Sequence, residues 1–222
     1  HSGANLLVGS EINGLTLASV GRGTKIEHIE IVSCADDNIE LFGGTVDLKY
    51  CTTLFGNDDM YDYDLGWSGR AQFLFGMKAQ QAGSSTETNA ISFDNDNGFE
   101  CDSDDNTSNA TLKSNPKIYN ATIIGNAKGA GAAPNNTGSA DNRGLAAINM
   151  KEAAQGTIAN SVFANFKNGF NIENTLTNRG AAGQGQRFCG RLQTLSGRRY
   201  HQLGIRRHRD GKSMAGIGGD GT

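Results

Sequence analysis

The chain has 222 residues, a formal net charge of −3, 31 glycines and only 2 prolines. This length suffices for one domain with a hydrophobic core, and the weak negative charge excludes a protein whose whole surface binds nucleic acid. No apolar run is long enough to cross a bilayer, so we expect no membrane insertion.

Short runs of Val, Ile, Thr and Phe lie between Gly- and Asn-rich segments. Gly and Asn adopt the positive φ angles that tight turns need. The first clear run, 25–31, alternates apolar and polar residues, and related segments follow at 117–123 and, more loosely, at 157–163. The pattern predicts short strands, each burying one face, that are joined by tight turns.

A second motif begins at Asp36: a polar pair, a turn residue, an apolar residue, an acid or amide, and another apolar residue. It recurs at 58–63, at 96–101 and, more weakly, at 167–172. The first two copies start at residues 36 and 58, which is about the spacing of one coil in a β-solenoid.

Stacked coils bury one apolar residue of each copy in a column, together with the residue two positions later. That column is predicted to contain Ile39, Tyr61, Phe99 and Phe170. Because side chains alternate across a strand, the residue between the two buried positions must point outward. The outward row is predicted to contain Glu40, Asp62, Glu100 and Asn171. The gaps after Asp62 leave room for intervening coils or loops.

These repeats predict an all-β fold, a right-handed parallel β-helix, over residues 1–178. Segments 80–89 and 127–142 are rich in Gly, Ala, Ser and Asn and are predicted to be protruding loops. Residues 145–154 fit either a short helix or another strand and turn. Residues 179–222 lack the pattern and carry nine Lys and Arg against two Asp. We interpret them as a separate tail, either a flexible interaction segment or, as we favour, the product of a reading-frame change.

The four cysteines (Cys34, Cys51, Cys101 and Cys189) show no CxxC spacing, which argues against a zinc site. We expect buried free thiols rather than a disulfide.

Several motifs between Asn13 and Asn126 resemble those of secreted β-helix proteins of marine and soil Bacteroidetes. They are the segments 13–17 (NGLTL), 23–29 (GTKIEHI), 42–46 (FGGTV), the acidic run 57–64 with 65–69 (LGWSG), and 97–100 (NGFE). The resemblance covers about half of the chain and implies an exported, extracellular or cell-surface solenoid that is often part of a larger protein. Many such proteins have no assigned activity. The resemblance implies nothing about the basic segment 179–222.

Carboxylates are concentrated in two runs, 58–64 and 94–105. Clustered carboxylates repel one another unless a cation lies among them, and Ca²⁺ takes six to eight oxygen ligands. A calcium site is therefore predicted, with candidate ligands Asp58, Asp59, Asp62, Asp64, Asp94 and Asp96. The simpler alternative is that both runs are solvated turns.

Parallel β-helices often bind or cleave acidic polysaccharides, and lyases of that shape pair calcium with a basic residue. By this analogy of fold, the candidate catalytic residues are Asp58, Asp59, Asp62 and Arg70. The candidate substrate-binding residues are Glu40, Lys49, Trp67 and Glu100, with Trp67 either exposed to stack on sugar or buried. A hydrolase with paired carboxylates is also open.

Two further functions stay open. One is a structural or adhesion segment without turnover. The other is an ester hydrolase with Ser68 as nucleophile and His28 as base. The sequence around Ser68 lacks the final glycine of a nucleophile elbow and the strand–turn–helix context that such an elbow needs.

Overall fold

The computed structural model describes residues 12–78, 97–104, 112–125, 146–166, 168–172 and 187–189. Their regular structure consists of short strands of three to five residues. Within these residues no helix has the length and hydrophobicity needed to cross a membrane.

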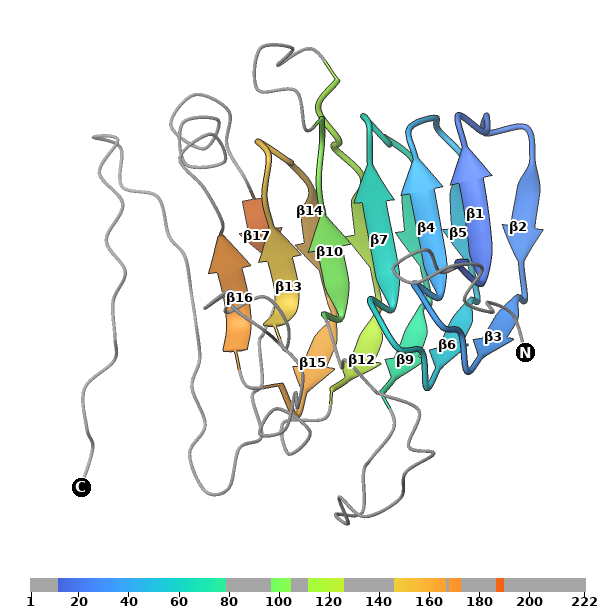
Figure 1. Ribbon diagram of the computed structural model, residues 1–222. Coiled ribbons are helices and arrows are strands. Elements are labelled where there is room, and N and C mark those ends of the chain that lie inside the picture. The colour runs from blue at the N-terminus through green and yellow to red at the C-terminus, as the bar shows by residue number, and fades with distance from the viewer. Residues whose placement is uncertain are drawn as a thin grey trace, which may run out of the picture.

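The strands form three parallel sheets, and the chain visits each sheet once per coil (Figure 1). Sheet 1 contains β1 (Leu15–Ala18), β4 (Ile39–Phe42), β7 (Tyr61–Asp64), β10 (Phe99–Cys101), β13 (Ala146–Met150) and β16 (Asn168–Ile172). Sheet 2 contains β2 (Lys25–Glu27), β5 (Asp47–Lys49), β8 (Arg70–Gln72), β11 (Lys117–Tyr119), β14 (Thr157–Ala159) and β17 (Arg187–Cys189). Sheet 3 contains β3 (Glu30–Val32), β6 (Thr52–Leu54), β9 (Phe75–Met77), β12 (Thr122–Ile124) and β15 (Val162–Ala164). Each strand pairs with its equivalents in the neighbouring coils, which is the predicted right-handed parallel β-helix.

The predicted inner column is confirmed. Ile39 aligns with Tyr61 and Tyr61 with Phe99, and all three are buried. Phe170 packs against the same core from the last coil. The column has one further member, Ile148 of β13, which aligns with both Phe99 and Phe170.

A ladder of turn side chains joins successive coils just before sheet 1. The Oδ1 atoms of Asn13 and Asp37 accept the backbone N–H groups of Asp37 and Asp59, at 3.2 and 2.9 Å. The Asp59 Oδ1 accepts the N–H of Asn97, and the Asn97 Oδ1 accepts that of Ala146 at 3.2 Å. We call Asn13, Asp37, Asp59 and Asn97 the turn ladder. It fixes the register that places each sheet 1 side chain inside or outside.

Coil length varies along the chain, and the spacing of the turn ladder measures it. Equivalent residues are 24, 22, 38 and 49 positions apart in successive coils. Asp62 and Glu100, which are 38 residues apart, therefore lie in adjacent coils. Glu100 and Asn171, which are 71 residues apart, are separated by the coil that contains Asn149. Residues 146–150 form strand β13, so the strand-and-turn alternative is correct and the helix is not. The predicted loops at 80–89 and 127–142 lie outside the described residues.

The last described strand, β17, lies within the segment interpreted as a separate tail and pairs with β14. Strand pairing therefore continues beyond residue 178. Cys34, Cys51 and Cys101 are buried free thiols, as expected.

Candidate carboxylate site on the outer face of sheet 1

The outward row of sheet 1 is confirmed by the strand register. Glu40 aligns with Asp62, and Asp62 aligns with Glu100. The row continues through Asn149 to Asn171. We call Glu40, Asp62 and Glu100 the acid row. Asn149 was missed because the sequence of residues 145–154 did not distinguish a helix from a strand.

Two flanking carboxylates extend the acid row. Oxygens of Asp37, Glu40 and Asp62 lie within 4.8 Å of one another, and so do oxygens of Asp62, Glu100 and Asp102. Asp62 belongs to both groups, so it lies at the centre of a continuous line of five carboxyl groups. Asp37 belongs to the polar pair of the motif and Asp102 to the carboxylate run 94–105, but neither was named among the candidate ligands.

Asp62 is the most constrained of these groups. Its side chain points outward from the strand, yet the residue is only 6% exposed, and its Oδ1 atom has no hydrogen-bond donor. Burial raises the pKa of Asp62 well above its usual range, and the neighbouring Asp37 and Glu100 carboxylates raise it further. Burial has the same effect on the pKa of Asp37. A buried carboxylate without donors is costly unless a proton or a cation neutralises it.

Glu40 shows the same effect at an intermediate exposure. Burial raises its pKa from 4.5 to about 7, although hydrogen bonds with Asn13 and Asp62 oppose the rise. At neutral pH Glu40 and Asp62 therefore hold protons that ordinary carboxyl groups would have lost.

Lys151 neutralises one end of the row. Its Nζ lies 3.1 Å from Glu100 Oε2 and 3.1 Å from Asp102 Oδ2. Burial and the Glu100 charge still raise the pKa of Asp102 to about 8, despite the opposing effect of Lys151. At the other end, Asp37 and Glu40 form no ion pair among the described residues, and the buried Lys78 donates from its Nζ to the backbone carbonyl of Asp58. Sequence reasoning missed Lys151 because 49 residues separate the strands that bring it to Glu100.

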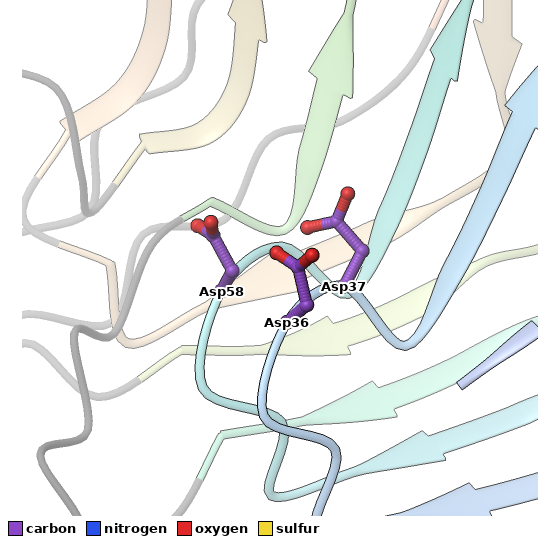
Figure 2. Close-up of side chains that lie close together, drawn as sticks. All are labelled: Asp36, Asp37 and Asp58. Atoms are coloured by element: carbon purple, nitrogen blue, oxygen red, sulfur yellow. The ribbon is translucent and has the colours of Figure 1, made fainter. Parts of the chain in front are cut away.

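The predicted ligands of the first acidic run divide into different environments. Asp58 forms a third group with Asp36 and Asp37, again with oxygens within 4.8 Å, and Figure 2 shows these carboxylates projecting to the same side of the turns leading into β4 and β7. Asp59 is buried and accepts a backbone N–H as a member of the turn ladder. Asp64 accepts the backbone N–H of Leu65 at 2.5 Å and belongs to none of the three described groups. Asp94 and Asp96 lie outside the described residues.

Arg70 and Lys49 do not lie beside these carboxylates. Both are on sheet 2, where Arg70 donates hydrogen bonds to Asp47 from its backbone N–H and its guanidinium. The prediction that Arg70 acts with Asp58, Asp59 and Asp62 is therefore wrong. The two segments are close in sequence, but the turn between β7 and β8 carries the chain around a corner of the solenoid.

Trp67 is buried and only 1% exposed. Its Nε1 donates to the Val46 carbonyl at 3.1 Å, and its ring packs against Tyr63 with centroids 5.6 Å apart. A ring in this position has no free face for a sugar, so its assignment to substrate binding is wrong.

The Ser68 and His28 pair also fails on geometry. Ser68 lies in the turn before β8, and His28 lies in the turn after β2, so the two are at opposite ends of sheet 2 strands. A three-residue strand spans about 10 Å, which exceeds the reach of a hydrogen bond. These residues do not form a nucleophile and base.

The donor chemistry of the acid row suits a hard divalent cation. Calcium binds carboxylate oxygens at about 2.3–2.6 Å, so two ligands of one ion lie up to about 5 Å apart. The oxygens of Asp37, Glu40 and Asp62 meet this limit. The donorless Oδ1 of Asp62 supplies a buried oxygen that such an ion would neutralise. The residues present therefore fit calcium, with solvent or a ligand completing the coordination shell.

Comparison with known proteins gives one result. A family model described as a pectate-lyase-like β-helix domain matches residues 1–191. No curated protein and no solved structure matches the chain.

Proposed function

The chain belongs to the pectate-lyase-like β-helix family, and from this premise we propose that it binds an acidic polysaccharide on sheet 1 through calcium. The ion is held by Asp37, Glu40 and Asp62. The uronate groups of the polysaccharide complete its coordination.

The observation that carries the proposal is the state of Asp62. This carboxyl group is nearly buried among other acids and has an oxygen without a donor. Such an arrangement destabilises the ion-free fold at neutral pH. A cation bound among these oxygens removes that penalty, and its remaining coordination positions are available to an anionic ligand.

The repeat of the solenoid supports a polymeric ligand. Neighbouring parallel strands are about 4.8 Å apart, close to the length of one sugar residue. A chain lying along the acid row would therefore meet one set of outward side chains per sugar. We propose in addition that the chain is extracellular, where calcium is abundant enough to occupy a site of this kind, and that it is part of a larger protein.

Binding without cleavage is the form of the function that the geometry supports best. A lyase needs a neutral base beside the bound uronate. Arg70 and Lys49 are on another sheet, and although burial lowers the pKa of Lys151, Glu100 and Asp102 raise it above its usual value. Lys151 therefore stays protonated and is a poor base.

A second candidate, hydrolysis, is favoured by one specific observation. The pKa values of Glu40 and Asp102, about 7 and about 8, leave protonated carboxyl groups beside the carboxylates that could serve as their partners. General acid catalysis uses such a pair. Hydrolysis would release reducing ends and should not require calcium.

The test uses the full chain and polygalacturonate, with calcium, with magnesium and with EDTA. We expect calcium to strengthen the binding and EDTA to remove this gain. The gain should be at least about tenfold smaller for Glu40→Gln/Asp62→Asn, because two of the three ligands are lost. Glu30→Gln, an exposed acid on sheet 3, is the matched control and should bind normally. An affinity that is the same in calcium and in EDTA would contradict the proposal. Reducing ends produced without the unsaturated ends that a lyase leaves, by the wild type but not by Glu40→Gln, would establish the hydrolase instead.

A further inference from the structure

A second surface of the β-helix has features that the acid row does not explain. At the corner between sheets 2 and 3, His28, Tyr50 and Phe73 occupy the same position in three successive coils. Their rings are stacked, with centroids 4.8 and 5.1 Å apart. Tyr50 and Phe73 are 42% and 41% exposed. We call these three residues the aromatic corner.

The backbone at this corner does not favour aromatic residues. His28, Tyr50 and Phe73 have φ angles of 57°, 55° and 57°, in the left-handed region. The next two coils place Asn120 and Asn160 at the equivalent position, with φ angles of 58° and 51°. Asn tolerates this conformation better than bulky residues do. Three exposed rings at positions that suit Asn are therefore not explained by the folding of the corner, and such strained positions are frequent at binding sites.

The outer face of sheet 2 beside this corner is basic, in a chain whose net charge is −3. Its strands β2, β5, β8 and β11 carry four outward cations: Lys25, Lys49, Arg70 and Lys117. Two acids oppose them: Glu27 pairs with Lys25 at 3.0 Å, and Asp47 pairs with both Arg70 and Arg22.

Lys49 and Lys117 have no carboxylate partner among the described residues. The Lys49 Nζ lies 5.0 Å from the centroid of the Tyr50 ring. Tyr119, which is 37% exposed, continues the aromatic surface next to Lys117 and aligns with Gln72 in the coil before it. The unpaired Lys49 and Lys117 therefore lie in the second and fourth coils, each in the same strand or turn as an exposed ring.

We propose that the aromatic corner and the adjoining lysines of sheet 2 form a second glycan-binding surface, which binds a carboxylate- or sulfate-bearing polysaccharide directly, without a metal ion. Lys49 and Lys117 contact the anionic groups, and Tyr50, Phe73 and Tyr119 contact the sugar rings. The coil spacing of about 4.8 Å lets one sugar residue align with each coil. This surface does not depend on the acid row.

The test is performed in EDTA, so that the calcium-dependent surface cannot contribute. The full chain is measured against immobilised polygalacturonate and dextran sulfate, with neutral dextran for comparison. We expect binding to both anionic polymers that weakens as salt is added, because exposed charges are screened, and no binding to neutral dextran.

The variant Tyr50→Asn/Phe73→Asn places in these coils the residue that coils four and five already use. It should keep its melting temperature within a few degrees and lose about tenfold or more in affinity, as for the removal of central aromatic contacts. Lys49→Ala/Lys117→Ala should weaken binding similarly. The control Val162→Thr, which changes a 45% exposed residue on sheet 3, should bind like the wild type.

Three results would overturn the proposal: no binding in EDTA, equal binding by Tyr50→Asn/Phe73→Asn, or equal affinity for neutral dextran. A fourth result, the oligomeric state of the chain, is measured by sedimentation. A wild-type dimer that Tyr50→Asn/Phe73→Asn dissociates would assign the surface to a second copy of the chain instead. Failure of this test leaves the calcium-dependent binding on sheet 1 intact, because that binding is absent in EDTA.

Discussion

The outer faces of sheets 1 and 2 are built by the same coil-to-coil register but treat charge in opposite ways. On sheet 1 the register aligns Glu40 with Asp62 and Asp62 with Glu100, so like charges are stacked and largely buried. On sheet 2 it aligns Lys25 with Asp47 and Glu27 with Lys49, so acids alternate with cations in the first two coils, and Lys25–Glu27 and Arg70–Asp47 form exposed ion pairs. In a solenoid, equivalent positions of successive coils lie one strand apart, so an acid at that position in each coil adds its repulsion to that of its neighbours. The stacked acids of sheet 1 therefore need a compensating proton or cation, whereas Lys25 and Arg70 of sheet 2 are neutralised by acids of the same sheet.

The largest expected effect separates the inside of sheet 1 from its outside. Ile39→Asp should destabilise the fold by about 4 kcal/mol or more, because it buries an unpaired charge in the core column. Glu40→Gln, one position along the strand, should be tolerated. Urea unfolding followed by circular dichroism measures both. Equal stability of Ile39→Asp and the wild type would show that the inside and outside positions are wrongly assigned.

The next effect compares the ion pairs of the two faces. Lys151→Met leaves Glu100 and Asp102 partly buried without their cation, so we expect a loss of about 2–3 kcal/mol. Lys25→Met removes an exposed pair, in which the lysine side chain is 77% exposed, and should cost less than about 1 kcal/mol. The same unfolding experiment compares them. Equal losses would mean that the sheet 1 carboxylates do not depend on Lys151.

The pH dependence of ion-free stability should have opposite signs on the two faces. The raised pKa values of Glu40 (about 7) and Asp102 (about 8) mean that the folded state retains protons that the unfolded state has lost. Stability from these groups is present below about pH 4 and is lost as the pH rises toward 8. At Asp47 burial opposes the change, but hydrogen bonds from Arg70 outweigh it and lower the pKa. The Asp47 contribution is therefore lost as the pH falls.

Melting curves in EDTA between pH 4 and pH 8 measure this difference. Asp62→Asn should flatten the decline toward pH 8, since it removes the charge at the centre of the acid row. Asp47→Asn should instead reduce the stability lost at low pH. A wild-type melting temperature that is constant from pH 5 to pH 8 would contradict the burial of the acid row.

The smallest effect concerns the aromatic corner. Tyr50→Asn relieves a left-handed backbone position, worth about 1–2 kcal/mol, but loses stacking on His28 and Phe73, worth about 0.5–1.5 kcal/mol per pair. The two effects nearly cancel, so we expect a stability change within about 1 kcal/mol. A loss of several kcal/mol would show that the corner is mainly a structural stack.

The sequence predicted the parts of this molecule that repeat. The motif at residues 36–41 and its copies predicted the β-helix, the inner column from Ile39 to Phe170 and the outward row, because alternation along a strand and stacking of coils are both periodic. The copies also showed that Glu40, Asp62 and Glu100 share a row, although the long insertions hid which coils are adjacent.

The parts that could not be predicted depend on single contacts between coils. Lys151 meets Glu100 across an insertion, and no periodic pattern marks it. Asp59 lies in the acidic run 57–64, which suggested a calcium ligand. In the structure its Oδ1 accepts the backbone N–H of Asn97, as a member of the turn ladder. Arg70 is close to Asp62 in sequence but lies around a corner, and Trp67 fills the core from a glycine-rich turn. In these cases the direction of a turn decides where the side chain lies, and the sequence pattern does not encode that direction.

The central claim is that the acid row of sheet 1 is a cation site. Thermal melting of the full chain at neutral pH, in calcium and then in EDTA, tests it most directly. Calcium should raise the melting temperature by several degrees through its preference for the folded state, and Glu40→Gln/Asp62→Asn should melt higher than the wild type in EDTA while losing most of the calcium response. A wild-type melting temperature that is the same in calcium and in EDTA would contradict the claim and leave Glu40 and Asp62 protonated rather than metal-bound.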